Sequence, residues 1–192
     1  TKHAHPSYCA MPPSRAVNRA PADRDIRSHT TVLGMDEFRF RDLCGRFATG
    51  ITIVTTFDAE DRPAGMTVNS FCSVSLDPPL VSIAIDRAAS AYDALVRAER
   101  WTVNVLASHQ EALSRRFAAL HAERFDGVGW RRGPDGELLL EGVLAHLHCT
   151  RHSAIEAGDH TVLLGTVTGG QAADHGRPLL YYRGGYADPD GL

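Results

Sequence analysis

The sequence lacks the features that mark membrane-spanning or nucleic-acid-binding proteins. No stretch of its 192 residues approaches the apolar length that a membrane span needs. The 20 Lys and Arg residues are interleaved with 23 Asp and Glu residues, giving a formal net charge of -3 and no basic stripe for nucleic acid. The charged-then-apolar order of a secretory signal is also absent at the N-terminus. We therefore expect a cytoplasmic protein with no membrane and no nucleic-acid partner.

Cysteine is scarce, and its distribution indicates a reducing compartment. Cys9, Cys44, Cys72 and Cys149 lie far apart in the sequence. The last three stand in apolar or periodic surroundings, where a reduced thiol packs as a small hydrophobic side chain. We expect free thiols buried in the protein.

The common catalytic signatures are missing. No Gly-x-Gly-x-x-Gly follows a predicted strand and no Walker-type loop is present, so any nucleotide must be held without the usual dinucleotide fold. No serine stands in a Gly-x-Ser-x-Gly elbow, and no cysteine has an activated setting. His146 and His148 share one predicted strand face while Cys149 points to the other, so these residues and His152 are weak evidence for metal.

The most informative segment runs from Gly65 to Val81. From Met66 to Leu76 two kinds of side chain alternate, which indicates a β-strand with one face against a core. The other face offers hydroxyls, an amide and one aromatic ring without any charge, which suits a polar ligand; the alternative is a half-exposed strand with a Ser/Thr-rich outer side. Asp77-Pro78-Pro79 ends the strand. The core face comprises Met66, Val68, Ser70, Cys72, Val74 and Leu76, and the polar face comprises Thr67, Asn69, Phe71, Ser73 and Ser75.

The rest of the chain alternates short β-rich segments with turns and contains few predicted helices. This order favours a mainly β fold, an antiparallel barrel with peripheral helices, in one domain over residues 35–192. Residues 1–34 are rich in proline and poor in large apolar side chains, so we expect a mobile N-terminal arm, or one that wraps a neighbouring subunit. We expect helices from Asp36 to about Ala48, from Ser90 to Ala98 and after a capping box at Ser108–Glu111, and a long loop at 121–136. The expected strands are 51–57, 80–85, 101–106, 138–149, 161–168 and 178–182.

Two further places could contact a ligand. Ser90 and Asp93 resemble a capping box, and the start of that helix could hold a phosphate with help from Arg87, although most helix starts bind only water. His160 follows Gly158-Asp159 at the predicted start of a strand, where its ring could reach a ligand or could have no role.

Several segments in order resemble the short-chain flavin reductase family. They are Gly45-Arg-Phe-Ala-Thr-Gly-Ile-Thr-Ile-Val-Thr-Thr56, Asn69-Ser-Phe-Cys-Ser-Val-Ser-Leu-Asp-Pro-Pro-Leu-Val81, Val103-Asn-Val-Leu106, Gly158-Asp-His160, Gly165-Thr-Val167 and Pro178-Leu-Leu-Tyr-Tyr182. The resemblance extends from about Phe38 to Tyr186. It implies a flavin-binding split barrel, usually homodimeric, that uses NADH or NADPH to reduce FMN or FAD for a separate flavin-dependent monooxygenase.

The resemblance also implies roles for particular residues. It implies that Thr67, Asn69 and Ser70 contact the flavin ring and ribityl chain. The flavin tail would lie along Ala84, Asp86 and Ser90, with Arg87 or Ser90 near the phosphate. His160 would contact the nicotinamide, and Tyr186 would border the same pocket. Two residues depart from the family pattern: Glu137 replaces a frequent proline, and Asn69 replaces a frequent serine.

The implied mechanism needs no protein nucleophile. Hydride passes from nicotinamide C4 to flavin N5, so the protein has to stack the two cofactors at about 3 to 3.5 Å and exclude water. We expect His160 to position the nicotinamide rather than donate a proton. The alternatives are a split-barrel oxidoreductase with tightly bound flavin that acts on an organic substrate, and a flavin-binding protein without turnover.

Overall fold

The computed structural model describes residues 34–119 and 123–187. The predicted mobile arm at 1–34 therefore lies outside the described residues, apart from Gly34. The strands are β1 (Thr49–Gly50), β2 (Thr52–Phe57), β3 (Pro63–Val68), β4 (Cys72–Leu76), β5 (Pro79–Asp86), β6 (Arg100–Val105), β7 (Trp130–Arg132), β8 (Leu138–Leu140), β9 (Ala145–Ala157), β10 (His160–Ala172), β11 (Leu180–Tyr182) and β12 (Gly185–Ala187). The helices are α1 (Glu37–Cys44), α2 (Tyr92–Arg97) and α3 (Glu111–Ala118), with a 3-10 turn, η2, at Ser108–Gln110.

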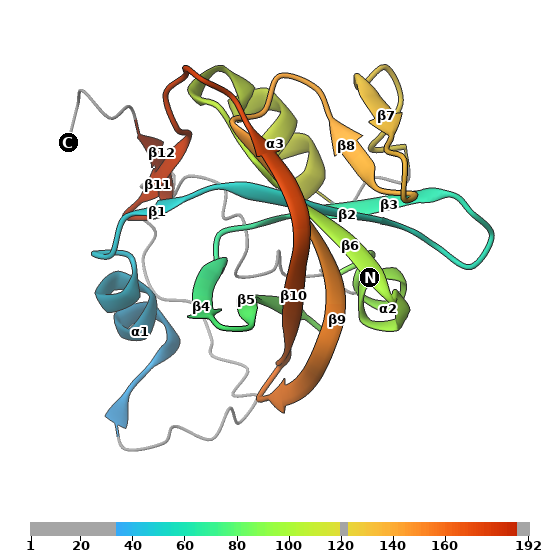
Figure 1. Cartoon of the computed structure of the whole chain (residues 1–192). Helices are drawn as coiled ribbons and strands as arrows, with labels where there is room; N and C mark the ends of the chain where they lie inside the picture. The colour runs from blue at the N-terminus through green and yellow to red at the C-terminus, as the bar shows by residue number, and fades with distance from the viewer. Residues whose placement is uncertain (1–33, 120–122, 188–192) are drawn as a thin grey trace.

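One seven-stranded sheet forms most of the body. Its order is β3-β2-β6-β9-β10-β5-β4, and each neighbouring pair is antiparallel. The sheet curls, with the long β9–β10 hairpin crossing the front of the view in Figure 1. Smaller sheets β1-β11-β12 and β7-β8 flank it, and none of the sheets closes over the described residues. This arrangement confirms the predicted mainly β, antiparallel split barrel.

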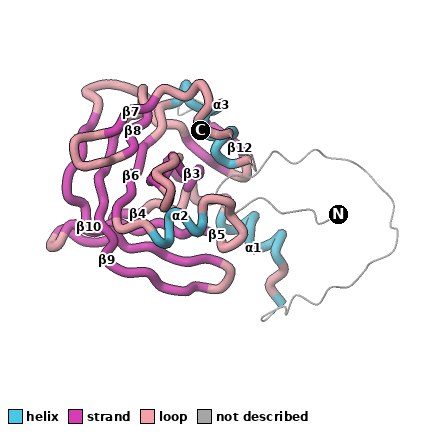
Figure 2. Tube along the Cα trace, turned by 90° about the vertical axis from the view of Figure 1, so that its right-hand side faces the viewer, coloured by secondary structure: helices cyan, strands magenta, loops and turns pink. Residues whose placement is uncertain are grey.

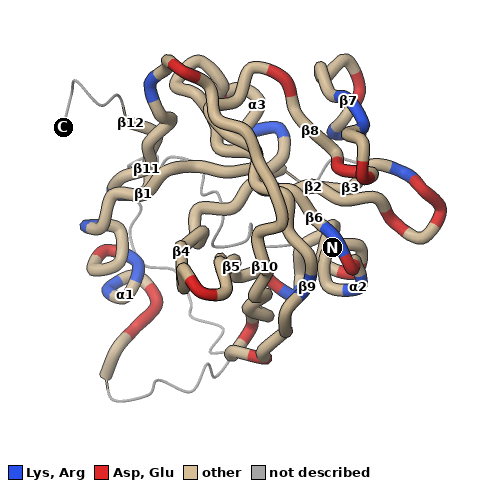
Figure 3. The backbone as a smooth tube through the Cα atoms, in the orientation of Figure 1, with Lys and Arg blue, Asp and Glu red and all other residues tan. Residues whose placement is uncertain are grey.

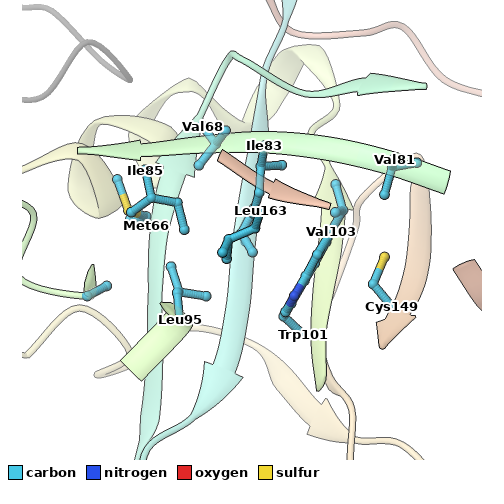
Figure 4. Packing of buried hydrophobic residues seen from close by; sticks show 12 residues of the cluster. Met66, Val68, Val81, Ile83, Ile85, Leu95, Trp101, Val103, Cys149 and Leu163 are labelled. Carbon is cyan, nitrogen blue, oxygen red and sulfur yellow. The ribbon is translucent and has the colours of Figure 1, made fainter. Parts of the chain in front are cut away.

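Two hydrophobic clusters lie on opposite faces of β2. Val54 belongs to the first cluster, which fills the inside of the curled sheet around Ile83, Trp101 and Leu163 (Figure 4). Ile53 belongs to the second cluster, which includes Phe117 of α3. Both faces of β2 are therefore buried, which explains why its sequence is β-branched or aromatic throughout.

Buried threonines of β2 satisfy their hydroxyls through backbone carbonyls. Thr52 Oγ1 donates to the Val68 carbonyl at 2.8 Å, and Thr55 Oγ1 donates to the Leu138 carbonyl at 2.7 Å. The predicted hairpin from β2 into β3 is confirmed, with Phe57 opposite Pro63.

The segment Gly65–Val81 forms two strands rather than one. β3 ends at Val68, β4 begins at Cys72, and the link between them contains Asn69 and Ser70. β4 is an edge strand whose Val74 and Leu76 are exposed, Leu76 by 96%. The prediction that these two side chains face a core is therefore wrong for the single chain.

The first helix is capped as predicted, but it is shorter and does not bury its apolar side. Asp36 accepts a hydrogen bond from the Arg39 amide at 2.7 Å, and the helix ends at Cys44 instead of Ala48. Phe40, Leu43 and Phe47 are exposed. Figures 1 and 2 both show α1 at the edge of the molecule, away from the strands.

Two predicted connections and one predicted strand differ from the structure. Residues 150–160, between the strands predicted at 138–149 and 161–168, are mostly strand, because β9 continues to Ala157 and turns through Gly158-Asp159 into β10, with Gly158 at φ 62°. The predicted strand at 138–149 is broken between β8 and β9. The predicted loop at 121–136 contains β7, and its first two residues, together with residue 120, lie outside the described part.

The two predicted capping boxes are also wrong. Ser90 is not the cap of α2, which starts after Ala91 without a side-chain cap. Ser108 is the first residue of η2, and α3 has no side-chain cap. Nor are all the described thiols buried: Cys149 is, but Cys44 and Cys72 are exposed.

Candidate functional site

A cavity of about 700 Å³ lies where three segments meet. Its walls come from the link between β3 and β4, from α1 and the residues after it, and from the turn between β11 and β12. Asn69 and Ser70 line it, together with the exposed thiols of Cys44 and Cys72. Two predicted flavin contacts therefore border one cavity.

Polar groups in this cavity wall lack partners among the described residues. Thr49 Oγ1 is buried there without a hydrogen bond. The Asn69 amide also makes no hydrogen bond within the ranges 34–119 and 123–187. Buried polar groups usually find partners, so the buried Thr49 Oγ1 fits a ligand that brings hydrogen-bonding groups of its own, as a flavin does, and the half-exposed side-chain amide of Asn69 is available to the same ligand.

Ser70 connects the cavity to strand β5. Its Oγ donates to the Ala84 carbonyl at 3.1 Å and accepts from the Ala84 amide at 2.9 Å. A hydroxyl has one hydrogen and two lone pairs, so Ser70 retains only an acceptor position for a ligand. The predicted contacts Ser70 and Ala84 are thus adjacent.

The outer face of the sheet continues this surface toward His160. In the register of β5 with β10, His160 lies opposite Asp86 and Val162 opposite Ala84. Asp86 turns back and accepts from the Ala88 amide at 2.7 Å, and the Arg87 amide donates to the Asp159 carbonyl at 3.0 Å. The structure therefore brings Ser70, Ala84, Asp86, Arg87 and His160 into one strip, although they come from three segments of the sequence.

The neighbouring carboxylate fixes the orientation of the His160 ring. Nδ1 lies 2.7 Å from Asp159 Oδ1, and because an ionised carboxylate can only accept, Nδ1 carries the hydrogen. This hydrogen bond lowers the pKa of Asp159. The His160 side chain is mostly buried, while that of Asp159 is exposed.

Thr67 and Tyr186 are connected through Ser114, and neither is among the residues that line the cavity. The fully buried Thr67 donates to the Ser114 carbonyl at 2.7 Å, and Ser114 Oγ and the Tyr186 hydroxyl are 2.8 Å apart. Burial raises the pKa of Tyr186. The Tyr186 ring packs edge-to-face against that of Tyr181, with centroids 5.5 Å apart, and Tyr181 does line the cavity. The Thr67 side chain is buried in the single chain, and its predicted flavin contact stays a prediction.

Ser90 contacts Arg124, a residue for which the sequence predicted no role. Arg124 Nη2 donates to Ser90 Oγ at 2.6 Å, although the two residues are 34 positions apart. The sequence carries little sign of this contact, because Arg124 is one of three arginines in the predicted loop at 121–136 and loop arginines usually lie in solvent.

Glu137, one of the two departures from the family pattern, lies away from this strip. Its carboxylate is 3.0 Å from Nδ1 of His148, in the wall of a second cavity of about 300 Å³ lined by β2, β6, β9, β10 and the turn before β8. None of the predicted site residues lines that cavity.

Charge does not gather on one surface. Figure 3 shows acidic and basic residues mixed on α1 and at the turns, while the middles of the barrel strands carry few charges. In the described ranges, no helix is long and apolar enough to cross a membrane.

Comparison with known proteins identifies the family. Residues 44–190 match the family model described as "Flavin reductase like domain". This chain belongs to that family. A flavin reductase of Pseudomonas putida is 40% identical to it over 147 residues, which cover 77% of this chain and 86% of the relative.

Two further matches are similar over most of the flavin reductase-like domain. Reductase subunit HsaB of a flavin-dependent monooxygenase, from Rhodococcus jostii (strain RHA1), is 39% identical over 158 residues, 81% of this chain and 80% of the relative. The solved structure of the Streptomyces globisporus NADH:FAD oxidoreductase SgcE6, in complex with NAD and FAD fragments, has a TM-score of 0.75 and 38% identity, and the match covers 81% of this chain and 94% of that one. The resemblance stated from the sequence is confirmed.

Proposed function

We propose that this flavin reductase-like domain is an NAD(P)H:flavin oxidoreductase that reduces FMN or FAD and supplies the reduced flavin to a separate monooxygenase. The observation that carries the proposal is the continuous strip from Asn69 and Ser70 through Ala84 and Asp86 to His160. The relatives named as a flavin reductase and as a monooxygenase reductase subunit support the same activity.

Each residue of the strip has a part in holding the two cofactors. Asn69 can donate to and accept from the polar edge of a flavin ring, and Ser70 can accept one hydrogen bond from it. The flavin tail extends along Ala84 and Asp86 toward Ser90 and Arg87, while His160 orients the nicotinamide. The two cofactors together supply the hydride chemistry, from nicotinamide C4 to flavin N5. The protein contributes alignment and exclusion of water, with no residue acting as a nucleophile.

We further propose that a second copy of the chain covers the exposed apolar residues. Phe47 is 78% exposed and Leu76 is 96% exposed, and Phe38, Val74 and Ile155 are exposed as well. Large apolar groups of this kind mark interaction surfaces in soluble proteins. Because Phe47 also lines the cavity, a homodimer would complete the flavin site at a subunit boundary. The exposed free thiols of Cys44 and Cys72 support a cytoplasmic location.

Steady-state NADH oxidation by protein dialysed free of flavin tests the activity. We expect turnover only after FMN or FAD is added, and a rate that saturates with flavin concentration. Turnover without added flavin would indicate a tightly bound flavin acting on another substrate. Flavin binding without any NADH oxidation would indicate a binding protein, and either result would overturn the proposal.

A further inference from the structure

Arg124 is a buried cation whose hydrogen-bond partners are all uncharged. Only 8% of the residue is exposed. Nε donates to the Ala119 carbonyl at 3.0 Å, Nη1 to the Gly65 carbonyl at 3.0 Å, and Nη2 to the Ala119 carbonyl and to Ser90 Oγ at 2.6 Å each. Among residues 34–119 and 123–187, no carboxylate forms an ion pair with it.

Part of this arrangement has a structural explanation. Ala119 is the C-terminal cap residue of α3, where a cation is favourable, and the bond to Gly65 ties the loop to β3. Neither role requires the bond to Ser90. A buried charge without a counter-ion is costly, and burial lowers the pKa of Arg124 accordingly. An anion at the other side of Ser90 would offset that cost.

Ser90 is well placed to connect the cation to such an anion. It is exposed, and its hydroxyl does not cap α2. Because Arg124 donates to one lone pair of Ser90 Oγ, the hydroxyl hydrogen is left to donate outward. The positive charge behind the oxygen makes this hydroxyl a stronger donor, and charge-assisted bonds to phosphate are stronger than neutral ones.

We propose that Arg124 is a positioning residue that orients and polarises the Ser90 hydroxyl toward a phosphate of the flavin, so that the site selects phosphorylated flavins over riboflavin. The inference rests on the proposed function, because Ser90 follows Asp86 and Arg87 of the strip directly after the turn in which the Ala89 amide donates to the Asp86 carbonyl at 3.0 Å. Arg124 acts through Ser90 and does not touch the cofactor itself.

Equilibrium binding tests the inference without any turnover. Titrations of flavin fluorescence give the Kd of FMN, FAD and riboflavin for the full chain and for Ser90→Ala, Arg124→Gln and Arg124→Lys. We expect Ser90→Ala and Arg124→Gln to weaken FMN and FAD about tenfold and to leave riboflavin unchanged. Arg124→Lys retains the charge and should recover part of the loss. The FMN affinity of the wild type should also fall with rising salt, and that of riboflavin should not.

The matched control is Arg97→Gln, which removes the same charge from an exposed arginine of α2 that pairs only weakly with Asp93, at 3.5 Å. It should leave all three affinities unchanged. Equal loss for FMN and riboflavin in Arg124→Gln and Ser90→Ala would mean a purely structural role and would overturn the inference, as would a wild type that does not prefer FMN. Should Arg124→Gln fail to fold, Ser90→Ala decides the contact with phosphate and Arg124→Lys decides the positioning role, because a partial loss for FMN with none for riboflavin is expected only if Arg124 acts through Ser90. A protein that binds FMN selectively but never oxidises NADH would refute the proposed function and leave the phosphate inference intact.

Discussion

Substituting Gly165 by alanine should destabilise the barrel, because Trp101 occupies the space that the new methyl group needs. A Cβ built at Gly165 would lie 2.4 Å from Trp101 Cζ2 and 2.5 Å from Cη2, about 1 Å inside ordinary van der Waals contact. Trp101 is 2% exposed and packed among buried neighbours, so the ring cannot move aside without disturbing them. Gly165 has no positive φ, so the cost comes from packing and not from backbone strain. Overpacking of this kind costs about 1 to 3 kcal/mol.

The free energy of unfolding in urea measures this cost, and two variants identify its origin. Gly50→Ala is the matched control, because a Cβ there meets nothing within 4 Å, and its stability should stay within about 0.5 kcal/mol of the wild type. Trp101→Phe removes the crowded atoms and breaks no hydrogen bond, since Trp101 Nε1 has none among the described residues. In a double-mutant cycle, Gly165→Ala should therefore cost at least about 1 kcal/mol less in the Trp101→Phe background. Equal costs in both backgrounds would refute the packing argument.

Three other predictions concern the site and the pH response. His160→Ala should lower kcat/KM for NADH about tenfold to a hundredfold and leave the Kd of flavin unchanged; a variant that keeps the wild-type kcat/KM would exclude the positioning role. In alkylation followed by mass spectrometry, the exposed Cys44 and Cys72 should react in the free protein and should be protected when FMN is bound. Burial raises the pKa of Cys149 to about 12, so this thiol should react only after unfolding. A lack of protection of Cys44 and Cys72 by FMN would place the flavin elsewhere. Burial lowers the pKa of His146, whose Nε2 donates to the Leu140 carbonyl at 2.8 Å, so the folded chain binds this proton less readily than the unfolded chain. The neutral His146 ring therefore stabilises the fold fully above about pH 6.5, and this stabilisation is lost as the pH falls below that value. His146→Gln should reduce the pH dependence of the free energy of unfolding between about pH 5 and pH 7.

The sequence predicted strands well where burial gives a clear pattern. β2 and β6 bury nearly every residue, so their β-branched and aromatic composition predicted them. The outer half of β9 failed for the opposite reason: residues from Arg151 to Ala157 are largely exposed and mixed in polarity, so only their pairing with β10 keeps them in a strand.

Val74, Leu76 and the apolar side of α1 show a different limit of the sequence. Their patterns predicted burial, yet these side chains are exposed in the single chain. An apolar pattern reports that a surface is to be covered, but it does not say whether the cover is the same chain or another copy. For these residues the error about burial becomes the main support for the proposed homodimer.

The candidate site was predictable at its surface and unpredictable one layer below. Asn69, Ser70 and His160 lie in contiguous motifs, so a resemblance along the sequence could find them. Ser114 and Arg124 act through single hydrogen bonds to Thr67 and Ser90, across separations of 47 and 34 residues, and no local pattern records such a bond. The orientation of a ligand-facing hydroxyl depends on the protein group that it contacts, and Ser70 and Ser90 differ in this respect. The hydrogen of Ser70 is donated to the Ala84 carbonyl, whereas that of Ser90 is directed outward by Arg124. Two serines that look equivalent in sequence should therefore serve the flavin differently, one as an acceptor near its ring and one as a donor at its phosphate.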